Sequence, residues 1–239
     1  MRKTTRGAKK YLVVMLLLCL WVTNINIVMA KESSTPKVIV IDPAFQENTD
    51  DTREPVGPGA FTTCESTSTG NTGVSTGYPE YELTLQVSLK LQNQLEESGY
   101  TVLLTRTTND VDITNSGRAM IANMADADLF IVVSANDSKA AGVEVVCQSD
   151  DNPYNYGNYS DGRLLSDAIL GSMKSNCAGN EVVEDDERAV MNWCQSPSTV
   201  VEVGSLENED DEAKLVTDEY QETLAQGIAA GVDSYFAQR

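Results

Sequence analysis

Short apolar runs alternate with longer amphipathic segments along most of this chain, and this alternation restricts the possible folds. Residues 37–41 (KVIVI) and 129–133 (LFIVV) lack the polar alternation of a strand with one wet face, so they predict strands that are buried on both faces. The 80–98 segment has apolar spacings that suit either a strand or a helix, but its length and the following Gly99 favour a helix. The predicted strands are 37–41, 100–105, 129–133, 143–147, 189–193 and 199–203, and the predicted helices are 80–98, 114–125, 160–173 and 220–236.

This order predicts an α/β fold in a single domain, with a mainly parallel central sheet flanked by helices. Residues 44–78 form a polar connection rich in Gly, Ser and Thr, and so long a connection is usually functional or disordered. Functional groups in such folds gather at the carboxyl ends of strands. We therefore expect them at 42–45, 134–137 and 202–204, and at Glu80, which opens the first long helix.

The N-terminus has the pattern of a secretory signal peptide. Residues 1–10 hold five cations and no acid, residues 11–22 are almost wholly apolar, and Val28 and Ala30 are small residues before a cut after position 30. We predict a signal peptide at 1–30, a short linker at 31–36 and the domain at 37–239, with a secreted, extracytoplasmic location. A retained anchor is the alternative, although twelve apolar residues are fewer than the roughly 17–25 of a membrane span.

Charge and composition exclude several classes of function. The net charge is −19, and removal of the signal segment leaves 12 basic and 36 acidic side chains, a net charge of −24. Such a chain repels polyanions, so nucleic acid is not an expected partner. The chain contains no histidine. That absence excludes a Ser-His-Asp triad, a Cys-His pair and any zinc site built on histidine.

Seven segments follow one another along the chain: IDPAFQ, PEYELTLQVSLKL, GYTVLLTRT, RAMIANMADADLFIVVSAN, GVEV, NWCQSPSTVVEVGSLEN and the C-terminal helix. In this order they resemble the zinc-dependent N-acetylmuramoyl-L-alanine amidases of bacterial cell walls, over roughly residues 37–237. A secreted branch of that family also has loops like those at 57–60 and 73–77. The resemblance implies an amidase-like three-layer sandwich, a cell-wall location, and peptidoglycan glycan or stem peptide as partner.

The resemblance also assigns the site residues. The family holds one zinc ion with two histidines and a glutamate, and a further glutamate is the general base. In this sequence Phe45 and Ser134 stand at the two histidine positions, Glu80 stands at the glutamate-ligand position, and Glu202 stands at the base position. Phenylalanine offers no lone pair and a neutral serine hydroxyl is a poor zinc ligand, so we expect no bound cofactor.

The resemblance therefore predicts a pseudo-amidase that binds peptidoglycan or regulates its turnover, with Glu202 as a vestigial base. An active amidase with a non-standard metal site is one alternative, and an envelope scaffold that binds a protein partner is another. A membrane would be contacted only through an uncleaved N-terminal segment. Glu80 has a simpler interpretation too, because an acid is favourable at a helix N-terminus.

Some features leave alternatives open. Asp42, Glu80, Asp137 and Glu202 could form an oxygen-only site for calcium or magnesium, although no calcium-loop spacing is present. The acidic runs 184–187 and 207–212 are expected to be solvated loops or helix starts.

Four cysteines follow the signal segment, an even number that makes disulfides plausible in an exported protein. Spacing does not fix their pairing, and reduced thiols are the alternative. Segments shared with the secreted branch favour a disulfide between Cys147 and Cys194. Cys64 and Cys177 would then form a possible second pair.

Overall fold

The computed structural model describes residues 35–49, 51–139, 141–174 and 181–239. The predicted signal segment 1–30 and residues 31–34 of the predicted linker lie outside the described residues. From Pro36 to Arg239 the chain forms one compact unit, as expected for a single domain. Within the described ranges, no helix has the length and apolar character that crossing a membrane requires.

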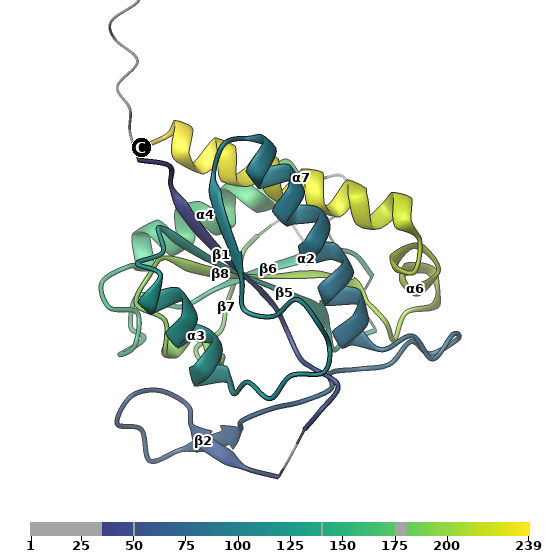
Figure 1. Ribbon diagram of the computed structural model, residues 1–239, viewed down its shortest axis with the longest axis horizontal. Helices are drawn as coiled ribbons and strands as arrows, with labels where there is room; N and C mark the ends of the chain where they lie inside the picture. The colour runs from purple at the N-terminus through teal and green to yellow at the C-terminus, as the bar shows by residue number, and fades with distance from the viewer. Residues whose placement is uncertain (1–34, 50, 140, 175–180) are drawn as a thin grey trace, which may run out of the picture. The chain divides into compact units, whose positions relative to one another are not determined.

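A six-stranded sheet with the order β4-β1-β5-β8-β6-β7 forms the centre of the domain (Figure 1). The pairs β1–β4, β1–β5, β5–β8 and β6–β7 are parallel, and β6 runs antiparallel to β8. The sheet is therefore mainly parallel, as predicted. The strands are β1 (Val38–Pro43), β4 (Thr101–Leu104), β5 (Leu129–Asn136), β6 (Glu144–Cys147), β7 (Val183–Glu184) and β8 (Ser198–Ser205).

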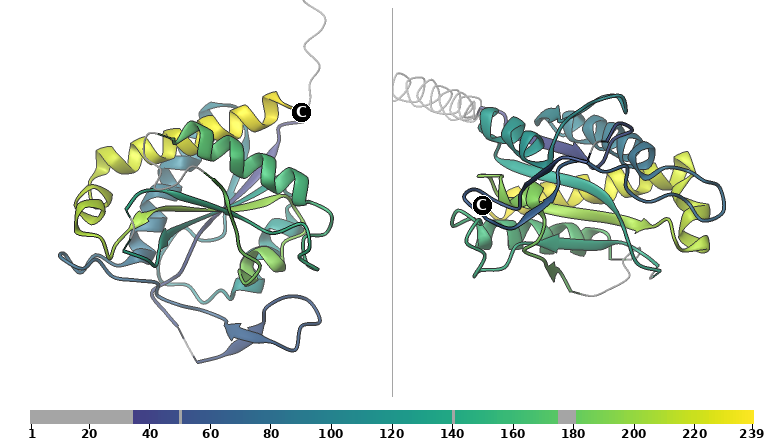
Figure 2. Two further views of the ribbon diagram at one scale, coloured as in Figure 1. Left: turned by 180° about the vertical axis from the view of Figure 1, so that it is seen from behind. Right: turned by 90° about the horizontal axis from the view of Figure 1, so that it is seen from below.

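Both faces of the sheet are covered, which explains why its strands are apolar at successive positions. Ile39 and Ile41 of β1 pack in one core cluster, and Val40 between them packs in another on the opposite face. The first cluster takes side chains from α2 (Glu80–Glu97), α4 (Tyr159–Ser172) and α7 (Asp218–Ala237), and the second takes them from α3 (Asn115–Met124) and α5 (Ala189–Asn192). Figures 1 and 2 show the resulting three layers.

Hydroxyl and amide side chains fix the starts of several helices. Thr114 caps α3 by accepting a hydrogen bond from the N–H of Gly117, and Thr217 caps α7 in the same way from Tyr220. Asn208 caps α6 (Glu209–Leu215). The predicted acidic run 207–212 is therefore largely a helix start, and its Glu212 also accepts hydrogen bonds from the backbone of the 73–77 loop.

Two sequence predictions of secondary structure are corrected. The predicted strand 189–193 is instead the helix α5 (Ala189–Asn192) followed by Trp193, because a short apolar run does not distinguish a buried helical turn from a strand. The connection 44–78 contains an antiparallel hairpin, β2 (Arg53–Pro55) with β3 (Thr63–Glu65), instead of lacking structure throughout.

The predicted disulfide between Cys147 and Cys194 is wrong, because both residues are free thiols. Side chains alternate between the two faces along a strand. Cys147 at the end of β6 lies in the cluster under α4 and α7, whereas Cys194 lies in the cluster beside α3 and α5. The sheet therefore separates the two sulfur atoms. Cys177, the possible partner of Cys64, lies outside the described residues.

The crossing of α4 and α7 gives a test of this packing. A Cβ atom on Gly231 would lie 2.5 Å from the Cα of Ile169, a backbone atom that cannot rotate away. We expect Gly231→Ala to lower the free energy of unfolding by about 1–3 kcal/mol in urea denaturation. The matched control is Gly171→Ala on α4, where a Cβ would meet no heavy atom within 4 Å. That change should be neutral or slightly stabilising, and equal losses in both variants would contradict the tight crossing.

Candidate functional site

Four predicted site residues lie near the carboxyl ends of β1, β5 and β8. Phe45 follows β1, Ser134 lies in β5, and Glu202 lies in β8 as the register partner of Ser134. Glu80 is the first residue of α2, and its carboxylate accepts a hydrogen bond from the Ser134 hydroxyl at 3.2 Å. The sheet register therefore brings together residues that are up to 157 positions apart in the sequence.

Glu80 is fully buried and is held mainly by backbone donors. Its Oε1 accepts the N–H of Ala135 and its Oε2 accepts the N–H of Asn71, both at 2.7 Å. The Ala135 N–H points to this carboxylate at a place where the register of β5 against β8 shifts. Burial raises the pKa of the Glu80 carboxyl, and these hydrogen bonds and the charge of Arg188 oppose the rise.

Phe45 and Glu80 approach the same point of the 44–78 connection. A Cβ atom on Gly70 would lie 2.7 Å from both the Phe45 ring and Oε2 of Glu80, so only glycine fits there. Gly70 also has a φ of +70°, which glycine adopts without strain. The loop therefore passes directly over the candidate site.

Glu202 is buried and forms an ion pair that the sequence analysis did not predict. Nη2 of Arg188 lies 2.8 Å from Oε1 of Glu202, and Nε of Arg188 lies 2.7 Å from Oδ2 of Asp185. Burial raises the pKa of the Glu202 carboxyl to about 7, although the guanidinium of Arg188 opposes this rise. Glu202 therefore changes its charge near neutral pH, beside a permanent cation.

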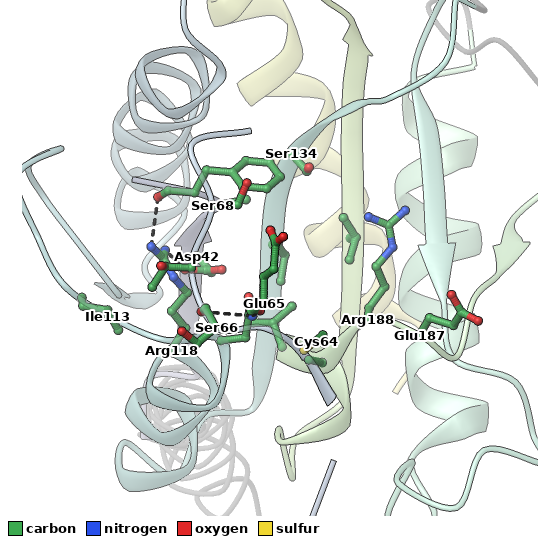
Figure 3. A pocket seen from close by; sticks show the side chains of 18 of the residues that line it. Asp42, Cys64, Glu65, Ser66, Ser68, Ile113, Arg118, Ser134, Glu187 and Arg188 are labelled. Atoms are coloured by element: carbon green, nitrogen blue, oxygen red, sulfur yellow. Dashed lines mark hydrogen bonds and ion pairs between the residues drawn. The ribbon is translucent and has the colours of Figure 1, made fainter. Parts of the chain in front are cut away.

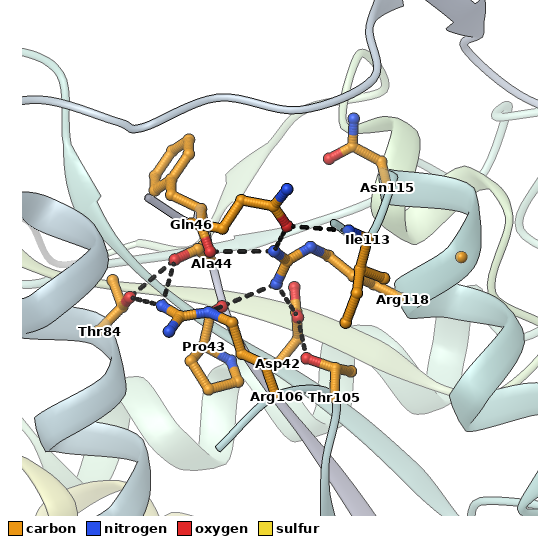
Figure 4. Close-up of polar contacts among 12 residues, drawn as sticks. Asp42, Pro43, Ala44, Gln46, Thr84, Thr105, Arg106, Ile113, Asn115 and Arg118 are labelled. Carbon is orange, nitrogen blue, oxygen red and sulfur yellow. Dashed lines mark hydrogen bonds and ion pairs between the residues drawn. The ribbon is translucent and has the colours of Figure 1, made fainter. Parts of the chain in front are cut away.

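A buried polar network holds the loop that carries Phe45 (Figure 4). Nη1 of Arg118 lies 2.8 Å from Oδ1 of Asp42, and both side chains are almost fully buried. Arg118 and Arg106 together donate to the carbonyl oxygens of residues 43–45 at 2.9–3.1 Å. These bonds hold Phe45 at a φ of 66°, a conformation that is uncommon for a bulky side chain.

Asp42 thus belongs to the structural network. Asp137 is exposed, and its charge acts on Glu202. Within the described ranges, no group of three or more Cys, Asp and Glu side chains is arranged to hold a metal ion. The oxygen-only site considered from the sequence is therefore not assembled.

A pocket of about 480 Å³ opens beside these residues, between the β2–β3 hairpin and the sheet (Figure 3). Its walls combine apolar side chains with hydroxyl and charged groups, which suits a ligand with both apolar and polar parts. Phe45, Ser134 and Arg188 all line it, so the candidate site faces this pocket. Other lining residues include Arg53, Cys64, Glu65, Ser68, Val132, Glu187, Val190 and Val200.

Comparisons with known proteins agree with this architecture. A sequence model of the family described as N-acetylmuramoyl-L-alanine amidase matches residues 39–234. The uncharacterized protein YqiI of Bacillus subtilis (strain 168) is 31% identical over 167 residues, which cover 69% of this chain and 78% of that protein.

Two solved structures are similar as well. The N-acetylmuramyl-L-alanine amidase Ami1 of Mycobacterium smegmatis has a TM-score of 0.77 at 20% identity, and the match covers 85% of this chain and 98% of that one. The CwlD amidase of Clostridioides difficile, solved in complex with the GerS lipoprotein, has a TM-score of 0.67 at 21% identity, covering 85% and 100%. At these identities the structural matches establish the fold.

The raised pKa of Glu202 predicts a pH-dependent stability. Between the ordinary value of 4.5 and about 7, the folded protein keeps a proton that the unfolded chain has released. The contribution of Glu202 to the free energy of unfolding therefore falls as pH rises through this window, by about 2–3 kcal/mol.

Glu202→Gln should remove this contribution, which urea denaturation at pH 5.0 and pH 7.5 measures as a difference from wild type. Glu65→Gln is the matched control, because Glu65 is an exposed carboxylate that lines the neighbouring pocket. The pH profile of that variant should follow wild type. Parallel profiles for wild type and Glu202→Gln would contradict the raised pKa.

Proposed function

The chain belongs to the N-acetylmuramoyl-L-alanine amidase family, and from that premise we propose that it is a pseudo-amidase of the cell wall. In this proposal the protein is secreted, does not hydrolyse the muramoyl–L-alanine bond, and binds peptidoglycan or regulates its turnover. One observation carries the proposal: Phe45 and Ser134 occupy the two positions that the resemblance assigns to histidine ligands.

The chemistry of the donors supports this proposal. Catalytic zinc takes three protein ligands and keeps one position for water. At the corresponding positions here, the Phe45 ring has no lone pair to donate, and the Ser134 hydroxyl is neutral and already donates to Glu80. Only the Glu80 carboxylate remains as a donor. These residues do not fit a zinc ion.

Glu202 has the chemistry of a base, but its surroundings do not favour hydrolysis. A carboxylate with a raised pKa can accept a proton from water near neutral pH. Amide hydrolysis also needs an electrophile that stabilises the developing oxyanion, which in metal-dependent amidases is the metal ion. Here the nearby cation Arg188 is already paired with Glu202 itself and with Asp185.

The pocket supports a binding role. Its apolar walls and its hydroxyl groups suit a peptide attached to a sugar, which is the chemistry of peptidoglycan. The N-terminal signal pattern supports secretion. The family match supports the cell wall as the location.

An envelope scaffold that binds a protein partner is the second candidate. The CwlD amidase, which has the same fold, was solved in complex with a lipoprotein. The net charge of −19 favours this candidate further, since anionic wall polymers would repel the chain.

Purified protein and isolated sacculi test the proposal directly. We expect the protein, purified without chelator, to carry far less than stoichiometric zinc by elemental analysis and to release no free stem peptide. We also expect it to sediment with the sacculi. Stoichiometric zinc with release of stem peptide would establish an active amidase instead, and failure to sediment would favour the scaffold.

Two matched variants test whether the pocket performs this binding. Glu187 is exposed and lines the pocket, so Glu187→Trp should obstruct its opening and lower retention on sacculi several-fold. Glu181 is also exposed but does not line the pocket. Glu181→Trp should therefore be retained as wild type is, and equal retention of both variants would place binding elsewhere.

A further inference from the structure

Arg188 brings a fixed positive charge to the candidate site. Its guanidinium forms the 2.8 Å ion pair with Glu202, and its charge also acts on the buried carboxylate of Glu80. The same side chain lines the pocket with Phe45 and Ser134. In Figure 3 the guanidinium is directed toward the end of the pocket where Ser134 lies.

The loop before α5 holds Arg188 in this position. The Asp185 carboxylate accepts a hydrogen bond from Nε of Arg188 at 2.7 Å. The neighbouring Asp186 accepts the N–H of Ser149 at 2.8 Å and the side-chain amide of Asn152 at 2.9 Å. The acidic run 184–187 is therefore not simply a solvated loop, because two of its carboxylates anchor the segment that presents Arg188.

We propose that Arg188 replaces the metal ion of the family as the positive charge of this site, and that it excludes a divalent cation. This inference rests on the proposed loss of the two histidine ligands. A guanidinium keeps its charge at every physiological pH, so a dication brought beside it is repelled. Its hydrogen bond also occupies an oxygen of Glu202, the residue at the position of the general base.

The proposal has a consequence for restoring the site. The double variant Phe45→His, Ser134→His would supply two imidazoles beside Glu80, the complete ligand set of the family. Arg188 would remain next to that set. We therefore expect the double variant to bind zinc poorly, and removal of the Arg188 charge to improve binding.

Zinc titration of three variants by isothermal calorimetry tests this expectation. Adding Arg188→Met to the double variant should tighten zinc binding by about tenfold or more, the effect of one unit charge on a nearby dication in a partly buried site. Adding Arg53→Met is the matched control. Arg53 lines the same pocket but bonds to Thr63, and it should leave the affinity unchanged.

Adding Arg188→Lys to the double variant separates charge from shape. Lysine keeps the positive charge, so the affinity should stay within about twofold of the double variant. Equal affinities with and without Arg188→Met, whether tight or undetectable, would overturn the proposal. A gain with Arg188→Lys as large as with Arg188→Met would overturn it too, since charge would not be the cause.

Circular dichroism and thermal melts check that each variant is folded, and Arg188→Gln replaces Arg188→Met if that variant fails to fold. Structural damage would weaken zinc binding, whereas the proposal predicts stronger binding. The test is separate from that of the proposed function. Zinc and turnover in the wild-type protein would overturn the pseudo-amidase, whereas differences among these variants concern Arg188.

Discussion

The buried ion pair between Arg118 and Asp42 fixes the segment that leaves β1, and the candidate site depends on that segment. Both side chains are at most 4% exposed. A buried ion pair is favourable only when its remaining donors are also satisfied. Arg118 meets this condition because it also donates to the carbonyl oxygens of Pro43 and Phe45 and to the side chain of Gln46. The network thus turns the chain at a set place and gives Phe45 its unusual backbone conformation.

The two buried carboxylates of the site are stabilised in different ways. Glu80 receives two backbone N–H groups, one from β5 and one from the 44–78 connection, so it joins segments of the fold that are distant in sequence. Glu202 receives a guanidinium. Without these donors each buried carboxylate would take up a proton rather than keep its charge. Both carboxylates therefore have structural reasons to be present, apart from any role in catalysis.

The sequence predicted those parts of the fold that depend on local patterns. β5 is apolar at most positions because both faces of the sheet are covered, and α2 begins at Glu80 as expected. The β2–β3 hairpin was missed because its strands are three residues long and carry no regular apolar alternation. The predicted Cys147–Cys194 disulfide failed because strand alternation and the intervening sheet, rather than sequence spacing, decide which sulfur atoms can meet.

The candidate site, too, was predicted only in part from the sequence. Family resemblance predicted positions 45, 80, 134 and 202, and the register of β1, β5 and β8 explains why Phe45, Ser134 and Glu202 lie near one another. Nothing in the sequence near Arg188 points to Glu202, since the pair forms only when the loop before α5 folds back beside β8. The sequence does show one local partner of Arg188: Asp185, three residues earlier, is a carboxylate within reach of the guanidinium.

The fold accommodates Phe45 and Ser134 because both side chains contribute to its own packing and hydrogen bonding. Phe45 packs against the apolar cluster beside α3 and α5, and the Ser134 hydroxyl donates to Glu80. The bonds that place these two positions come from Arg118 and Arg106, and from Glu80, whose carboxylate is itself held by the backbone N–H groups of Asn71 and Ala135. Because the position of each residue and its chemistry are set by different groups, the chemistry of the site can change while its geometry stays fixed.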